Sequence, residues 1–204
     1  MRFMLLSGTV LLLAAGAIAP PAIAAGSKSE AVAATKDKLG HAVGVISAEM
    51  TTTTKGFAGA AAATDLYEVE AAKVALERSK APKVRQLAQA MIAAHTKTTT
   101  ELKAIVAAEK LDVALPDKLD TRHQTLIDDL RGIKPAEFDE RYAGQQVDVH
   151  KEALILMRGY HAKGDNKALK KFAGNVENAV KMHLSMAERL SKSTEAAEEK
   201  NEKR

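Results

Sequence analysis

Apolar residues that recur at steps of three and four positions constrain this chain more than any other feature. Such spacing is typical of one face of an α-helix, and it continues through four long segments between Phe57 and about Ser191. In three of these segments one histidine lies within the apolar face. The three histidines are His95, His150 and His183. The spacing therefore predicts helices that pack through their apolar faces and turn three imidazoles inward.

Short turns join the four segments into two hairpins. Pro82 suits the first turn of a helix, where its missing N–H costs no hydrogen bond, so only a few residues separate a helix over 57–79 from one over 82–110. Gly164 stops a helix over 135–163, and the last helix follows directly. Helices joined by such short turns lie antiparallel. We therefore expect two αα-hairpins.

The connection between the hairpins is about 25 residues long and carries its own apolar pattern. A break at 115–117 precedes a short amphipathic stretch over 119–130, which Gly132 and Pro135 end. Aromatic residues are only 3% of the chain and tryptophan is absent, whereas alanine, lysine, glutamate and leucine favour helix. The fold class predicted is all-α, a four-helix bundle with a long crossover that carries a short extra helix.

The first 24 residues have the layout of a signal peptide. Arg2 precedes an apolar run over 4–19, and Ala22-Ile23-Ala24 offers a small-x-small cleavage site. We expect export to the periplasm and a mature chain that begins near Ala25 and has no transmembrane helix. The chain has no cysteine, so packing rather than disulfides must hold an exported fold together.

The mature chain divides into three parts. An N-terminal extension and linker cover 25–56; an amphipathic pattern runs over 32–50, and 51–56 breaks it because four threonines and a glycine disfavour helix. The bundle covers 57–191. The tail, 192–204, is almost wholly charged or small, which predicts disorder.

Acidic and basic residues alternate along the predicted helices, and the formal net charge is only +4. This pattern is typical of a solvated surface, and it lacks the concentrated basic face of a nucleic-acid-binding protein. We therefore expect no nucleic-acid partner. The pattern does not decide the oligomeric state, and a partner in the envelope is compatible with it.

Counting the helical rise from each predicted turn places Glu68, His95 and His150 at one level of the bundle. His183 comes out about one turn away, nearer to Gln146. Imidazole and carboxylate groups on facing helices are the usual ligands of transition metals in helical bundles. The predicted ligands of one iron, manganese, copper or zinc ion are Glu68, His95, His150 and His183.

Two further residues, Asp139 and Gln146, share the His150 face and could ligate or support the ligands. A second interpretation involves no metal: the inward histidines then specify packing in an envelope stress or interaction protein. An enzyme is a third, for which no nucleophile, phosphate loop or paired Glu-x-x-His motif is visible. We interpret His123 and His161 as local structure. We interpret the methionines as core residues: Met91, Met157, Met182 and Met186.

Four short stretches resemble an exported bacterial family called domain of unknown function 4142, over about 57–190. They are 68–77, 91–95, 138–142 with Gln146 and His150, and His183-Leu184. The resemblance implies a ferritin-like bundle and export, and it brings no established activity. The recurrent positions of the family correspond here to Glu68, His95, Phe138, Asp139, Tyr142, Gln146, His150 and His183. Asn175-Val176-Glu177 replaces the usual Leu-Pro before the last histidine, which should straighten the final helix.

Overall fold

The computed structural model describes residues 52–202, with side chains up to residue 196. Within this part of the chain there are five α-helices, one short 3₁₀ helix and no strand, so the predicted all-α class is confirmed. The predicted signal peptide and the amphipathic pattern over 32–50 lie outside the described residues. The elements are α2 (Thr54–Arg78), α3 (Pro82–Ala108), α4 (Thr121–Gly132), η1 (Pro135–Glu137), α5 (Phe138–Lys163) and α6 (Lys167–Glu202).

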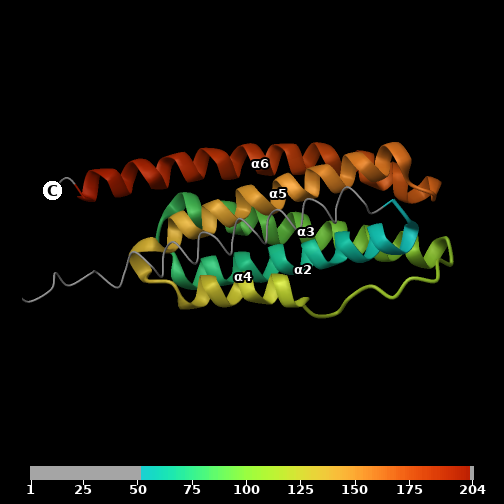
Figure 1. Cartoon of the computed structure of the whole chain (residues 1–204), viewed down its shortest axis with the longest axis horizontal. Helices are drawn as coiled ribbons and strands as arrows, with labels where there is room; N and C mark the ends of the chain where they lie inside the picture. Colours follow the sequence, from blue (N-terminus) through green and yellow to red (C-terminus); the bar gives the residue numbers. More distant parts are fainter. Residues whose placement is uncertain (1–51, 203–204) are drawn as a thin grey trace, which may run out of the picture.

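Four long helices lie side by side as two hairpins (Figure 1). α2 packs along α3 and α5 packs along α6, and the hairpins meet where α2 touches α5 and α3 touches α6. α4 packs outside, mainly against α2, and returns the chain to the end where α2 turns into α3. Arg78 secures this return, because its guanidinium donates to the backbone carbonyls of Leu130 and, over 2.6 Å, of Ile133. The crossover therefore starts α5 at the level that the sequence predicted.

The first long helix begins earlier than predicted, inside the presumed linker. α2 starts at Thr54, and the hydroxyl of Thr53 accepts a hydrogen bond from the Gly56 N–H as the N-cap. Thr54 also donates to a carboxylate oxygen of Asp165 over 2.6 Å. These bonds offset the low helix propensity of the threonines. The sequence prediction relied on that propensity alone and therefore started the helix too late.

The last helix ends later than predicted. α6 reaches Glu202, so the residues up to 202 that were expected to form a disordered tail are helical. The segment 192–202 contains neither glycine nor proline and is rich in alanine, glutamate and lysine, which favour helix strongly. The Ser191 hydroxyl also donates to Glu195 one turn on, over 2.9 Å. α6 is uninterrupted through 175–177, as the missing proline predicted.

Buried apolar side chains form two clusters, one toward the α2–α3 turn and one toward the α5–α6 turn. Leu87 belongs to the first and Phe172 to the second, and both are nearly inaccessible, at 3% and 4% exposed. Leu66 and Val69 on α2 are only half-buried. A layer of buried polar side chains separates the two clusters, and it contains the three histidines.

The methionines are not all core residues, contrary to the prediction. Met91 and Met157 are buried, and Met186 packs against the first cluster, but Met182 is 56% exposed. Met182 precedes His183, whose side chain points inward, and a rotation of about 100° per residue turns its neighbour toward solvent.

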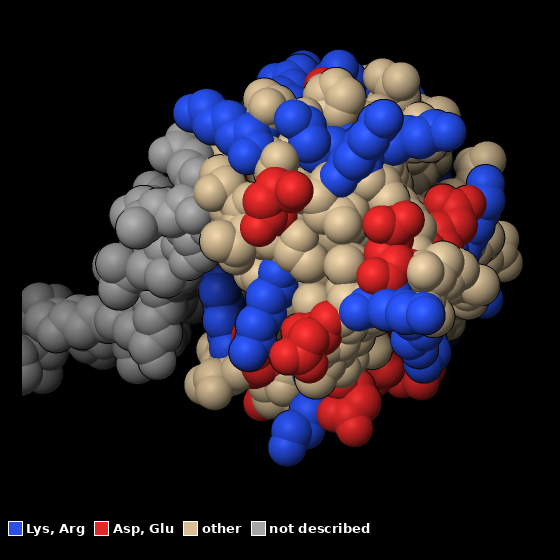
Figure 2. Space-filling view, turned by 90° about the vertical axis from the view of Figure 1, so that its right-hand side faces the viewer, with Lys and Arg blue, Asp and Glu red and all other residues tan. Residues whose placement is uncertain are grey.

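The surface of the described residues carries charges of both signs. Figure 2 views the end of the molecule that includes the α5–α6 turn. Lys and Arg side chains gather along the upper edge, and below this edge Asp and Glu side chains are mixed with further Lys and Arg. None of the helices within 52–202 has the length and apolarity needed to cross a bilayer.

Candidate metal centre

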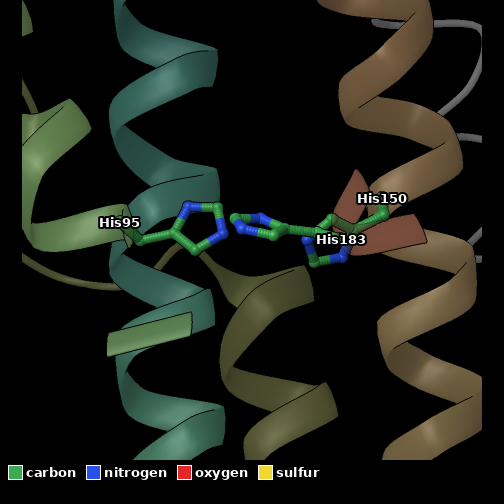
Figure 3. A group of neighbouring side chains, drawn as sticks. All are labelled: His95, His150 and His183. Carbon is green, nitrogen blue, oxygen red and sulfur yellow. The ribbon is translucent and has the colours of Figure 1, made fainter. Parts of the chain in front are cut away.

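Three imidazoles from three helices meet in the polar layer (Figure 3). His95 comes from α3, His150 from α5 and His183 from α6, and their ring centroids are 5.5 to 5.7 Å apart. One ring nitrogen of each lies within 4.8 Å of the other two. All three residues are buried, with 5%, 1% and 4% of their surface exposed. This is a close cluster of nitrogen donors inside a largely apolar core.

The hydrogen bonds of His95 and His150 orient their free nitrogens toward this cluster. Nδ1 of His95 is 2.8 Å from Oδ1 of Asp65, and Nδ1 of His150 is 2.8 Å from the backbone carbonyl of Gln146. Because a carbonyl and a carboxylate only accept, each Nδ1 carries the hydrogen, and in the neutral ring Nε2 keeps its lone pair. Nε2 of both residues is buried without a partner, and so is Nδ1 of His183.

Asp65 is held in place by a small hydroxyl network. Its second oxygen, Oδ2, accepts from Thr98 and from Thr99, each over 2.9 Å. Asp65 is on α2, whereas His95 and both threonines are on α3, so the network fixes the two helices at this level. A carboxylate behind the far nitrogen of a histidine is a common support of metal-binding imidazoles. Asp65 was not among the site residues predicted from the sequence, although it lies one turn before Glu68 on the same helix face.

A second set of buried polar atoms also lacks hydrogen-bond partners. It comprises both carboxylate oxygens of Glu68, both amide atoms of Gln146 and the hydroxyl of Tyr142. All three residues have 0% of their surface exposed, and Oε1 of Glu68 is 3.4 Å from Nδ1 of His150. Tyr142, Gln146 and His150 follow one another at steps of four along α5, which places them on one helix face opposite Glu68.

Burial changes the protonation of these groups. It raises the pKa of Glu68 to about 7, although the nearby charge of His95 and the Gln146 amide act in the opposite direction. Burial, together with the nearby charge of His95, lowers the pKa of His150 to about 3 and that of His183 to about 4. For His95, burial lowers the pKa, but the bond to Asp65 and the charge of Glu68 outweigh it, so that the pKa is raised. His150 and His183 are therefore neutral at neutral pH and free to donate their lone pairs.

The donor set fits a transition-metal ion. Bonds from imidazole to zinc or copper are about 2.0–2.1 Å, so two nitrogens on one ion are at most about 4.2 Å apart. The three nitrogens lie within 4.8 Å of one another, and small side-chain rotations would bring them to bonding distance. Neutral imidazoles suit zinc, copper, iron and nickel.

Comparison with known proteins places the chain in a family. The family model described as Domain of unknown function (DUF4142) matches residues 43–190, well over half of the sequence. The chain belongs to the DUF4142 family. No curated protein and no solved structure matches it. The family is therefore confirmed, and the matched region begins earlier than the resemblance had indicated, in a segment outside the described residues.

The DUF4142 positions named from the sequence mostly converge on the polar layer. His183 lies directly beside His150, although counting residues had placed it nearer to Gln146, because side chains reach across the offset of about one turn. Phe138 stacks parallel to Tyr142, with centroids 6.3 Å apart, and belongs to the apolar cluster. The residues that the structure does bring to the layer are Glu68, His95, Tyr142, Gln146, His150 and His183.

Asp139 does not reach this layer. It is half-buried near the start of α5, 11 residues before His150, which is about 16 Å along the helix. The helical face predicted it beside the site, but the rise along the helix separates it from the ligands. His123 and His161 are local structure in this DUF4142 chain, as predicted, because their Nδ1 atoms bond to Asp120 and to the backbone carbonyl of Lys170.

A surface groove of about 460 Å³ reaches the edge of the polar layer from outside. It lies over α2 and α3 beside the segment that leads into α4, and its lining includes Asp65 and Thr99 together with Lys73, Lys103 and Arg131. Because Asp65 is bonded to His95, the groove connects solvent with the support of one of the three histidines.

Proposed function

We propose that this DUF4142 protein binds one transition-metal ion in its helical core through His95, His150 and His183, and holds it for buffering or stress protection in the bacterial envelope. One observation carries the proposal: three buried histidines from three helices each bring a ring nitrogen within 4.8 Å of the other two, and each has a buried ring nitrogen without a hydrogen-bond partner. A buried polar atom without a partner costs about 1–3 kcal/mol. One ion would satisfy all three nitrogens at once.

The packing interpretation accounts for only half of the same geometry. It explains why Nδ1 of His95 bonds to Asp65 and why Nδ1 of His150 bonds to a backbone carbonyl. It leaves the inner nitrogens of these residues and of His183 unsatisfied. If the histidines served packing alone, apolar residues of similar size would fill the space without this cost.

The charges around the cluster favour a divalent ion. Asp65 and Glu68 are the carboxylates next to the histidines, through the 2.8 Å bond to His95 and the 3.4 Å approach to His150. When both are ionised they supply two negative charges beside three neutral ligands. A buried ion is tolerated when neighbouring charges compensate it, so the pair matches one divalent ion.

The ligand types set an order of preference among metals. Nitrogen ligands favour the later first-row ions, and affinity rises from manganese through iron to a maximum at copper, with zinc below copper. Since the close cluster consists of imidazoles, we expect copper or zinc to bind more tightly than iron or manganese.

The proposed localisation in the bacterial envelope rests on the signal-peptide layout of residues 1–24. Mass spectrometry of the protein released from the periplasm should find a chain that begins near Ala25. Recovery of Met1 in a membrane fraction would contradict export as a cleaved, soluble protein. One ion per chain suits buffering or protection from free metal better than bulk storage.

The metal site is tested on protein purified without a histidine tag. Elemental analysis and calorimetry with manganese, iron, zinc and copper should find about one ion per chain in the wild type, and none held stoichiometrically in His95→Ala or His150→Ala. His123→Gln is the matched control, because His123 is also buried but bonds to Asp120 away from the cluster. Binding that persists in both alanine variants, or no binding by the wild type, would refute the proposal.

A further inference from the structure

We infer that the histidine site has an open fourth coordination position, occupied at rest by an exchangeable solvent molecule that Glu68 and Gln146 hold. This inference rests on the proposed metal site and goes beyond it, because it assigns a small-ligand site to groups that three histidine ligands leave unused. Three donors do not complete the four-coordinate shell that zinc and copper commonly take with imidazoles.

The second set of unpartnered atoms marks where this ligand lies. Four buried atoms of Glu68 and Gln146 lack hydrogen-bond partners, and both residues are completely inaccessible. Gln146 lies one turn before His150 on the same face of α5, and Glu68 approaches that histidine to 3.4 Å from α2. Unsatisfied atoms next to the histidines indicate an occupant with hydrogen-bonding capacity.

Glu68 is placed to hold a ligand rather than to bind the ion itself. Its Oε1 approaches Nδ1 of His150, which bonds to a backbone carbonyl, and not the inward Nε2. In the described part of the chain, the group whose donor atoms all lie within 4.8 Å of one another comprises His95, His150 and His183, without Glu68. A carboxylate that contacts an ion through one water lies about 4–5 Å from it. Glu68 thus fits the outer position.

A second cation explains the same atoms less well than solvent does. Oxygen donors suit hard cations, but the Gln146 amide nitrogen carries hydrogens that a cation cannot accept. A water bound to the ion keeps two hydrogens to donate and one lone pair to accept, so it can donate to the Glu68 carboxylate and accept from the Gln146 amide. A second divalent ion would also leave buried positive charge beyond what Asp65 and Glu68 compensate.

An open coordination position would make this a site that exchanges ligands rather than a purely structural metal site. Metal sites that serve only structure are closed by four protein ligands, whereas sites with three histidines and one solvent molecule exchange that solvent for substrates or small anions. The DUF4142 chain would then present its ion to ligands the size of azide.

The test uses the full mature chain loaded with Cu²⁺ as the probe. Pulsed electron paramagnetic resonance in D₂O should detect exchangeable deuterons on a ligand of the ion, and azide should change the copper spectrum with saturation. Glu68→Gln should retain one copper per chain and tighten azide binding at least about threefold, because a negative charge beside the anion is gone. Gln146→Leu should weaken azide binding, because an amide donor is lost. Glu152→Gln, which removes a buried carboxylate that pairs with Arg122, should leave azide binding unchanged.

Each alternative has its own result. One copper per chain with neither exchangeable deuterons nor an azide response would show a closed shell and overturn this inference, while the metal site would stand. Loss of stoichiometric copper in Glu68→Gln would make Glu68 a direct ligand and also overturn it. Two copper ions per chain, reduced to one by Gln146→Leu, would identify a second cation. Absence of copper binding in the wild type would overturn the proposed function, and this inference with it.

Discussion

His95 and Asp65 are joined by a bond of 2.8 Å between Nδ1 and Oδ1, which links α3 to α2 at the level where the three histidines meet. Thr98 and Thr99 hold the other oxygen of Asp65, so the carboxylate cannot turn away without losing two more bonds. The pair fixes the hydrogen of His95 on Nδ1 and directs the lone pair of Nε2 inward. Asp65 therefore belongs to the candidate centre, although it does not face the ion.

Asp65→Asn should weaken zinc binding by about 10- to 100-fold while the protein stays folded. The amide keeps the shape of the side chain but removes the charge that makes His95 a stronger donor. Competition titration with a zinc-binding dye measures the change. Asp129→Asn, which alters a carboxylate paired with Arg141 on the outside, is the control. Equal affinities in the wild type and Asp65→Asn would show that the pair only joins α2 to α3.

Metal binding should raise the melting temperature, because α3, α5 and α6 each contribute one ligand. At a free zinc concentration 100 times the dissociation constant, the stabilisation is about 2.7 kcal/mol, which corresponds to roughly 5–11 °C for a domain of this size. A chelator should reverse the shift. Calorimetric melts of the wild type and His150→Ala with and without zinc provide the measurement, and a similar shift in both proteins would contradict a shared ion.

Leu87→Ala and Phe172→Ala should each destabilise the fold by about 2–5 kcal/mol, since each removes a buried side chain from one of the two apolar clusters. Met182→Ala provides the contrast, because this side chain is 56% exposed, and should change stability by less than about 0.5 kcal/mol. Urea denaturation of the metal-free proteins measures all three. Losses of similar size in all three variants would mean that the helices are rotated relative to this structure.

The helices themselves were predictable because their signals are local. Apolar spacing, Pro82 and Gly164 located four long helices and both turns, and every helix end except the C-terminal end of α6 was predicted to within a few residues. The errors fall at the ends, at Thr54 and Glu202, where a cap at Thr53 and strong helix formers decided the boundary rather than the apolar pattern. Helix ends depend on a few side-chain hydrogen bonds, and the spacing of apolar residues carries no information about them.

The candidate centre was predictable only in part. His95, His150 and His183 could be named because a polar residue inside an apolar stripe stands out, and counting the helical rise put them near one level. Asp65 did not stand out, because its importance comes from a contact with a residue 30 positions later in the chain. Asp139 was included wrongly, since sharing a face of a helix does not imply sharing a level. Pairings between helices need the structure.

The protonation of Glu68 should make the stability of the metal-free protein depend on pH. Burial raises the pKa of Glu68 from 4.5 to about 7, so the folded state binds its proton more tightly than the unfolded state does. The resulting stabilisation is complete below about pH 4.5 and is lost as the pH rises through 7. Buried His150 and His183, with pKa values lowered to about 3 and about 4, act in the opposite direction and cost stability as the pH falls below 6.5.

Glu68→Gln isolates the first of these effects, because an amide has the shape of a protonated carboxyl and does not titrate. The stability of the variant relative to the metal-free wild type should therefore increase between about pH 5 and about pH 8, by up to roughly 3 kcal/mol. Urea denaturation at both pH values measures the difference. With zinc bound the order should reverse at the higher pH, because the ionised carboxylate then compensates the ion. A difference between variant and wild type that is the same at both pH values, with and without zinc, would mean that Glu68 is not buried beside the histidines as this structure places it.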